Sequence, residues 1–171
     1  MSDILYFGDA KRERGFHHVH LLAKRLPDIK FKILMRYKFP DCEKDLQDMK
    51  DMGNINLILF ATPRRIKEEL KSTKLVLLPY VWMAMRPPLT LVEAMSLGKC
   101  VITSQMGGNE ELITDGFDGR MVDFYYLESV IQVIRYLLKE NSVREEMGRN
   151  AKETIAKLYS QDEYRKILNG Y

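Results

Sequence analysis

The chain has 171 residues, of which 46% are hydrophobic and 30% charged, and this predicts one soluble globular domain with a substantial core. Lys and Arg number 27 against 24 Asp and Glu, and the resulting net charge of +3 is too small to indicate nucleic acid as the main partner. No apolar run approaches the roughly 20 residues that span a bilayer, and no secretory signal is expected.

Short apolar runs alternate with longer amphipathic stretches along the whole chain. The apolar runs predict strands over residues 4–7, 31–35, 56–60, 75–78, 101–103 and 120–122. The spacing of apolar residues and the Pro and Gly boundaries predict helices over residues 16–26, 42–52, 63–70, 90–97, 130–138, 142–158 and 161–171. Gly98 follows one of these helices, where a left-handed residue is wanted, and Ser142 is expected to cap another.

Several of the expected strands are almost entirely apolar, which is typical of a parallel sheet covered by helices on both faces. Regular alternation of strands and helices indicates a single α/β domain over residues 1–171, with a doubly wound, Rossmann-like parallel sheet. Ligands of such sheets bind at the carboxyl ends of the strands. The loops of interest therefore follow Phe7, Met35, Phe60, Pro79 and Ser104.

The first of these loops runs from Gly8 to Gly15 and precedes a predicted helix. Free backbone N–H groups at the start of that helix favour an anion, and Arg14 adds a positive charge. The glycine spacing is neither that of a dinucleotide-binding fingerprint nor that of a P-loop. The spacing alone leaves two interpretations open, a phosphate-binding loop and a solvated charged turn.

A longer series of motifs in the second half of the chain resembles glycosyltransferase family 4, whose members have the GT-B fold and retain anomeric configuration. The matching segment corresponds to the nucleotide-sugar-binding half of that fold, and the opening Tyr6-Phe7-Gly8 with Arg14-Gly15 is similar to its start. The motifs in chain order are Leu78-Pro79, residues 89–99, residues 101–104, residues 107–113 and residues 115–122.

The resemblance implies a role for each matching position around a nucleoside diphosphate sugar. Glu93 is the second acid of a Glu-x7-Glu motif and would accept hydrogen bonds from the ribose hydroxyls. The backbone at Leu89 and Thr90 would meet the diphosphate at a helix N-terminus. Arg14 would stabilise the departing diphosphate and is the candidate catalytic residue.

Further binding positions follow from the same resemblance. Gly8 and Gly15 bound the first loop, and the loops after Met35 and Phe60 would hold the base. Gly107 and Gly108 could let a ligand approach the backbone, or could serve only as a turn.

Two departures from the family pattern alter the expected site. The first acid of the Glu-x7-Glu motif is replaced by Met85, and an Arg of the first loop is replaced by Asp9, whose carboxylate would repel a diphosphate. A glycine-rich stretch is replaced by Arg86-Pro87-Pro88, and Arg86 could supply a cation at the phosphates instead.

The remaining reactive side chains suggest no metal centre. His17, His18 and His20 lack an acid or Cys at a matching spacing, so a cluster on a helix surface is expected. Cys42 and Cys100 make neither a disulfide framework nor a tetrahedral metal set, which favours reduced thiols in the cytoplasm, with Cys100 in the core. The apolar patch of Trp82, Met83 and Met85 is either loop packing or a face toward another domain.

The expected function is transfer of a sugar from a nucleoside diphosphate sugar to an acceptor, with no tightly bound cofactor and no metal. A complete GT-B enzyme needs a second domain for the acceptor, so we expect a missing N-terminal acceptor-binding domain or a partner chain, and peripheral association with a membrane face. The alternatives are a non-catalytic nucleotide-sugar-binding module and, less favoured, a nucleotide-sugar epimerase of similar fold.

Overall fold

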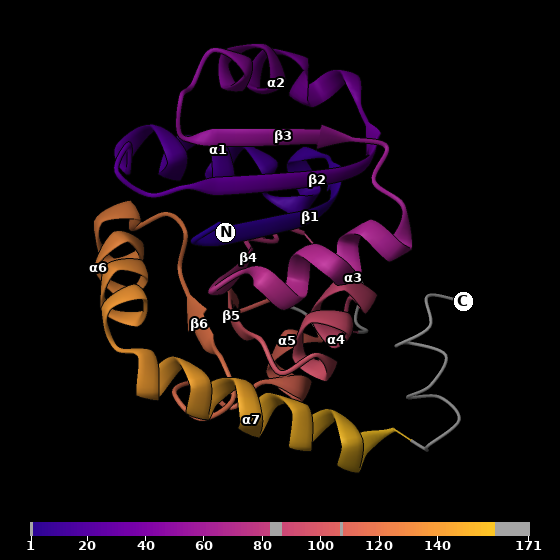
Figure 1. Cartoon of the computed structure of the whole chain (residues 1–171), viewed down its shortest axis with the longest axis vertical. Coiled ribbons are helices and arrows are strands. Elements are labelled where there is room, and N and C mark those ends of the chain that lie inside the picture. The colour runs from indigo at the N-terminus through magenta and orange to yellow at the C-terminus, as the bar shows by residue number, and fades with distance from the viewer. Residues whose placement is uncertain (1, 83–86, 107, 160–171) are drawn as a thin grey trace.

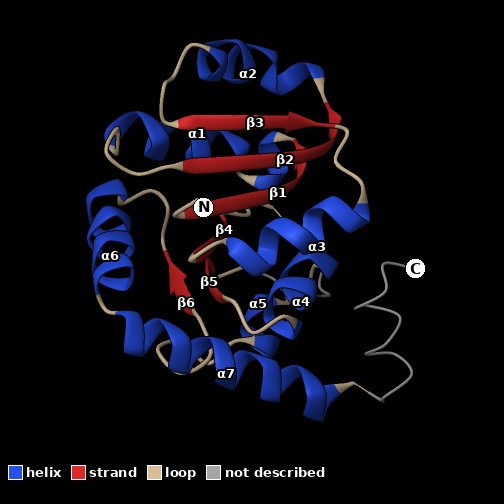
Figure 2. Ribbon diagram, viewed as in Figure 1, coloured by secondary structure: helices blue, strands red, loops and turns tan. Residues whose placement is uncertain are grey.

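The computed structural model describes residues 2–82, 87–106 and 108–159, which form a six-stranded sheet with helices packed on both faces (Figure 1, Figure 2). The strands are β1 (Ile4–Ala10), β2 (Phe31–Lys38), β3 (Ile55–Leu59), β4 (Leu75–Leu78), β5 (Cys100–Ser104) and β6 (Arg120–Val122). The helices are α1 (Phe16–Arg25), α2 (Glu43–Lys50), α3 (Pro63–Ser72), α4 (Leu89–Ser96), α5 (Asn109–Leu112), α6 (Leu127–Lys139) and α7 (Asn141–Leu158).

The sheet is parallel throughout, in the order β3-β2-β1-β4-β5-β6. The chain builds outward from β1 to β3, then returns to the other side of β1 with β4. This reversal makes the carboxyl ends of β1 and β4 the switch point, where a doubly wound sheet leaves a crevice for a ligand. The predicted fold class is confirmed.

Alternate residues of each strand point into two separate cores. Ile4 and Tyr6 of β1 join the core under α1, α2 and α6, whereas Leu5 and Phe7 join the core under α3, α4 and α7. All four side chains are almost completely buried. Because both faces must be apolar, the strands read as continuous apolar runs in the sequence.

Several predicted boundaries are corrected. The strands β1 and β2 continue to Ala10 and Lys38, beyond the ends that the apolar runs suggested, so Gly8 and Met35 lie within strands. Ser142 is not a cap, because α7 already begins at Asn141 and Glu140 is its N-cap.

Other local predictions are confirmed or lie outside the described residues. Gly98 has a φ of 70°, as expected for the residue after α4, and Cys100 is buried in the core. The short helix α5 was not predicted. The predicted helix over residues 161–171 lies outside the described residues. Within the described part of the chain, no helix is both long and apolar enough to cross a membrane.

Candidate functional site

A cavity of about 190 Å³, here called the β1–α4 cavity, opens at the switch point of the sheet. Its walls come from the carboxyl ends of β1 and β2, the turn before α1, the residue after Pro79 and the first turn of α4. The lining residues are Tyr6, Phe7, Gly8, Asp9, Arg14, Arg36, Tyr80, Leu89 and Thr90. The volume is below the roughly 300–1,000 Å³ of a typical ligand pocket, so it suits one part of an extended ligand.

The charges around this cavity favour an anion. Among the described residues, Arg14 and Arg36 line it together with the carboxylate of Asp9. The first turn of α4 also faces it, and a helix N-terminus carries a partial positive charge. Asp9 therefore lowers the positive potential of the cavity without reversing it.

Arg14 is held in place by a very close approach of two chain segments. Gly15 has a φ of 70°, and a Cβ at this position would lie 1.5 Å from the carbonyl oxygen of Pro79. Only glycine permits this contact, which brings the Arg14 guanidinium over the ring of Tyr80, 5.7 Å from its centroid. Gly15 does not line the cavity, so its observed role is structural.

The N-terminus of α4 presents backbone donors to the cavity. Pro88 is the N-cap residue, and its carbonyl oxygen accepts from the amides of Leu91 and Val92 at 2.9 and 3.2 Å. The amides of Leu89 and Thr90 precede these and have no carbonyl within their own helix to bind. The Thr90 hydroxyl is hydrogen-bonded to that of Tyr80, which links the helix start to the loop after β4.

Glu93 lies one turn further along α4 and is paired with Arg36. The Arg36 Nη2 atom is 3.9 Å from the Glu93 Oε2 atom, and the side chain of Glu93 is largely buried. Burial raises the pKa of Glu93, while the charges of Arg36 and Lys67 act in the opposite direction. Glu93, the predicted ribose ligand, is not among the residues that line the cavity, but it lies next to Arg36, which does line it.

The two residues predicted to mark the base-binding loops differ in their surroundings. Met35 is buried within β2 and pairs in register with Gly8 and Leu59, so its side chain belongs to the core. Phe60 directly follows β3, is 69% exposed and has a φ of 56°, an uncommon backbone conformation for an aromatic residue. Neither lines the β1–α4 cavity.

Residues of the glycine-rich motif after β5 have a structural role. Gly108 precedes α5 with ordinary helical angles and lines neither this cavity nor a second one described below. Asn109 is buried, and its Nδ2 donates to the Thr103 hydroxyl at 3.1 Å and the Ser104 carbonyl at 2.9 Å. Gly107, Met85 and Arg86 lie outside the described residues.

Sequence reasoning missed two side chains of the cavity, Arg36 and Tyr80. Each lies at or just beyond the carboxyl end of a strand beside β1, which is the signal that could have identified it. The expected histidine cluster on the α1 surface is partly wrong, since His18 is buried. Among the described residues, no group of three or more His, Cys, Asp or Glu could hold a metal ion.

Comparison with known proteins identifies the family of the chain. A family model described as glycosyl transferases group 1 matches residues 2–154. The chain belongs to this family. Group 1 glycosyl transferases of known structure share the fold: the C-terminal domain of the group 1 protein LpcC from Francisella tularensis superposes with a TM-score of 0.74 at 20% identity, covering 92% of this chain and 86% of that domain.

Two further relatives are much longer than the matched segment. A structure of Anabaena HepE in complex with UDP-glucose has a TM-score of 0.80 at 14% identity, and the match covers 99% of this chain but 47% of that one. The Escherichia coli UDP-Gal:alpha-D-GlcNAc-diphosphoundecaprenol alpha-1,3-galactosyltransferase is 29% identical over 99 residues, covering 58% of this chain and 25% of that protein. The chain therefore corresponds to a small part of the curated relatives it matches.

Proposed function

We propose that this chain is the donor-binding domain of a retaining glycosyltransferase of family 4, with a nucleoside diphosphate sugar as its substrate. The observation that carries the proposal is the β1–α4 cavity, where Arg14, Arg36 and the N-terminus of α4 surround a space at the switch point of the sheet. This combination of charge and backbone donors suits a diphosphate.

The positions of Glu93 and Phe60 extend the proposed site on either side of the diphosphate. A carboxylate with two acceptor oxygens suits the vicinal hydroxyls of a ribose, and Glu93 lies beside Arg36, which lines the cavity. Phe60 offers an exposed aromatic face at the carboxyl end of β3, where a base could stack. Its unusual backbone angles are of the kind that concentrates at functional sites.

The names of the relatives are consistent with this substrate class. HepE is described in complex with UDP-glucose, and the E. coli relative is named as a transferase that uses UDP-Gal. We infer the same class of donor here, and we propose that a second domain or a partner chain binds the acceptor.

The proposed chemistry breaks the bond between the anomeric carbon and the diphosphate oxygen. A hydroxyl oxygen of the acceptor forms the new bond to that carbon on the same face, and its proton passes to an oxygen of the departing diphosphate, which also takes the electron pair of the broken bond. Arg14, Arg36 and the amides of Leu89 and Thr90 would stabilise the negative charge that grows on the leaving group.

The proposal is tested by incubating the full-length protein with UDP-, GDP- and ADP-linked hexoses and a panel of glycoside acceptors. We expect sugar transfer with one donor, and an anomeric proton coupling in the product that matches the configuration of the donor. Inversion of this configuration would exclude the retaining mechanism, and interconversion of donor sugars without an acceptor would indicate an epimerase.

A second candidate is a non-catalytic nucleotide-sugar-binding module. The observation that favours it is the presence of Asp9 in the lining of the β1–α4 cavity, where its carboxylate opposes an anionic ligand. Tight donor binding without transfer to any acceptor, and without turnover in an Asp9→Asn variant, would favour the module.

A further inference from the structure

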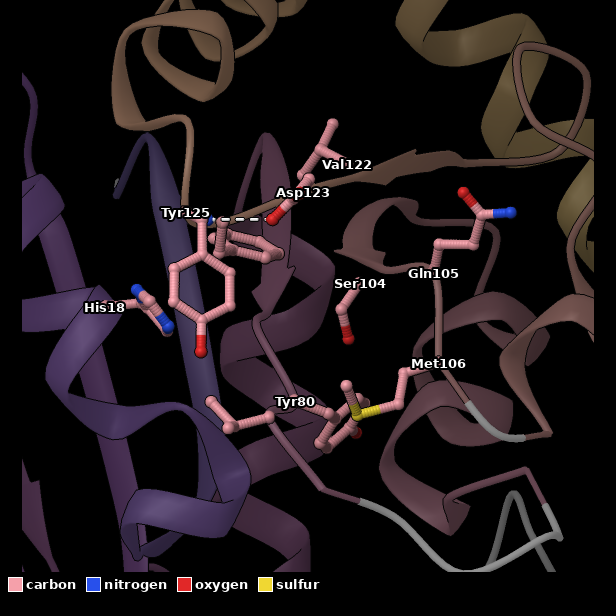
Figure 3. Close-up of a pocket in the computed structure, with 10 residues that line it drawn as sticks. His18, Tyr80, Ser104, Gln105, Met106, Val122, Asp123 and Tyr125 are labelled. Carbon is pink, nitrogen blue, oxygen red and sulfur yellow. Dashed lines mark hydrogen bonds between the residues drawn. The ribbon is translucent and has the colours of Figure 1, made fainter.

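A second and larger cavity, here called the β5–β6 pocket, lies beside the first at the same edge of the sheet. Its volume is about 320 Å³. Figure 3 shows Ser104 and Asp123 around it, with His18 of α1 beside the ring of Tyr125. Tyr80 lines both cavities, so a ligand in one lies next to a ligand in the other.

Two buried polar atoms of this pocket have no protein partner among the described residues. They are the Ser104 Oγ and the His18 Nδ1 atoms. Both residues are more than nine-tenths buried, and the Ser104 hydroxyl points into the pocket in Figure 3. Burying polar groups unpaired is unfavourable, so this pair fits a ligand that brings its own donors and acceptors.

The charges of the described lining residues do not favour a diphosphate, the ligand that suits the β1–α4 cavity. Among the described residues that line the β5–β6 pocket there is no Lys or Arg, and the carboxylate among them is that of Asp123. The Asp123 Oδ1 atom accepts from the Tyr125 amide at 2.9 Å, which leaves the other oxygen as an acceptor. Burial lowers the pKa of His18 to about 4, so its ring is neutral at pH 7. Among the described lining residues a phosphate would meet the Asp123 carboxylate and no cation, whereas hydroxyl groups would meet acceptors.

Aromatic rings complete the pocket. The ring of His18 lies 5.6 Å from that of Phe124 and 6.4 Å from that of Tyr125, measured between centroids. Tyr125 is 86% exposed, so its ring can cover a ligand without losing packing elsewhere. Apolar ring faces combined with a few convergent polar groups are typical of pockets that orient a small ligand.

We propose that the β5–β6 pocket binds a neutral sugar ring beside the nucleotide in the β1–α4 cavity. The hydroxyls of the sugar would pair with Ser104, His18 and Asp123, and one of its faces would pack on Tyr125. The inference rests on the proposed function, which places a nucleotide in the neighbouring β1–α4 cavity. The ring could belong to the transferred sugar of the donor or to a sugar of the acceptor, and the experiment separates these two sources.

The test uses calorimetry on this chain in two arms. The first compares UDP, GDP and ADP with their glucose-linked forms. The second titrates methyl glycosides of glucose, galactose and N-acetylglucosamine into the chain saturated with the best-binding diphosphate. Each arm is repeated with Tyr125→Ala and Ser104→Ala, and with Tyr126→Ala and Ser142→Ala as controls. The control residues are exposed and lie outside the pocket lining.

We expect Tyr125→Ala to weaken sugar binding about tenfold and Ser104→Ala to weaken it about 2–10-fold, with unchanged affinity for the bare diphosphate. Ser104→Ala removes an unpartnered buried hydroxyl, so it should fold as well as the parent. An effect in the first arm identifies the donor sugar, and one in the second identifies an acceptor sugar.

The inference is overturned if neither arm shows a sugar contribution, or if the pocket variants and the controls behave alike. Failure of the proposed function would give a different result, because the bare diphosphates would then not bind the parent chain at all.

Discussion

Arg36 at the end of β2 and Glu93 in α4 meet across the carboxyl edge of the sheet, with 3.9 Å between the Arg36 Nη2 and Glu93 Oε2 atoms. Because Arg36 also lines the β1–α4 cavity, the pair connects the expected ribose ligand to the expected phosphate site. This chain carries Asp9 where its family resemblance calls for an Arg, and Arg36 supplies a cation to the same cavity from a different strand.

Arg36→Gln is expected to weaken binding of a nucleoside diphosphate by about 3–10-fold while leaving the bare nucleoside less affected, because it removes a cation that lines the cavity. The difference between the losses of affinity for the diphosphate and for the nucleoside should shrink at high salt, which screens the attraction between charges. Arg64→Gln is the matched control, since Arg64 is highly exposed on α3 and lies outside the cavity. Equal losses for the two variants in calorimetric titrations would remove Arg36 from the site.

Glu93→Gln is expected to weaken a ribonucleoside diphosphate by about 1.5–3 kcal/mol, the value of a hydrogen bond to a charged group. A 2′-deoxyribonucleoside diphosphate lacks one of the two hydroxyls that Glu93 would bind, so the variant should weaken it less. The measurement is the dissociation constant of each ligand for parent and variant. An identical loss for both ligands would show that Glu93 does not contact the 2′-hydroxyl.

Gly15→Ala is expected to destabilise the fold by about 2–5 kcal/mol, since the new Cβ would be strained by the positive φ and would collide with the Pro79 carbonyl. Gly116 also has a positive φ, of 80°, but nothing lies within 4 Å of a Cβ there. Gly116→Ala should therefore cost only about 1–2 kcal/mol. Urea unfolding of both variants separates collision from backbone strain, and similar costs would contradict the close approach at Pro79.

His18 should make the protein less stable in mild acid. Burial and the neighbouring His17 lower its folded pKa to about 4, against 6.5 for an ordinary histidine, while the charge of Asp123 acts in the opposite direction. Between these values the unfolded chain binds a proton that the folded chain does not. The free energy of unfolding should therefore fall by about 2 kcal/mol from pH 7.5 to pH 5 on account of His18. His18→Gln should lack this part of the pH dependence. Urea unfolding at several pH values measures it, and the same change in the free energy of unfolding with pH for parent and variant would contradict the prediction.

The architecture could be predicted from the sequence because each buried strand leaves its own local signal. The apolar run over residues 75–78 matches β4 at both ends, and the helix predicted over residues 90–97 is shifted by one residue from α4. The strand ends were less predictable. Arg36 lies in β2 beyond its apolar part, where a charged residue looks like any solvated strand end.

The second pocket could not be predicted, because it depends on contacts between distant segments. His18 belongs to a polar run of histidines in the sequence, and its burial results from the packing of α1 beside Phe124. The unpartnered Ser104 hydroxyl is likewise visible only when β5, β6 and α1 are assembled. Local patterns contain no information on such neighbours.

The central claim is that the β1–α4 cavity binds the diphosphate of a nucleotide sugar, and calorimetry of the parent and Arg14→Ala chains tests it most directly. UDP, GDP, ADP and the matching nucleosides are titrated into each chain. We expect at least one diphosphate to bind the parent, and at 100 times its dissociation constant to stabilise the fold by about 2.7 kcal/mol. Arg14→Ala should weaken that diphosphate far more than its nucleoside. The claim is contradicted if no diphosphate binds, or if the variant loses nucleoside and diphosphate equally.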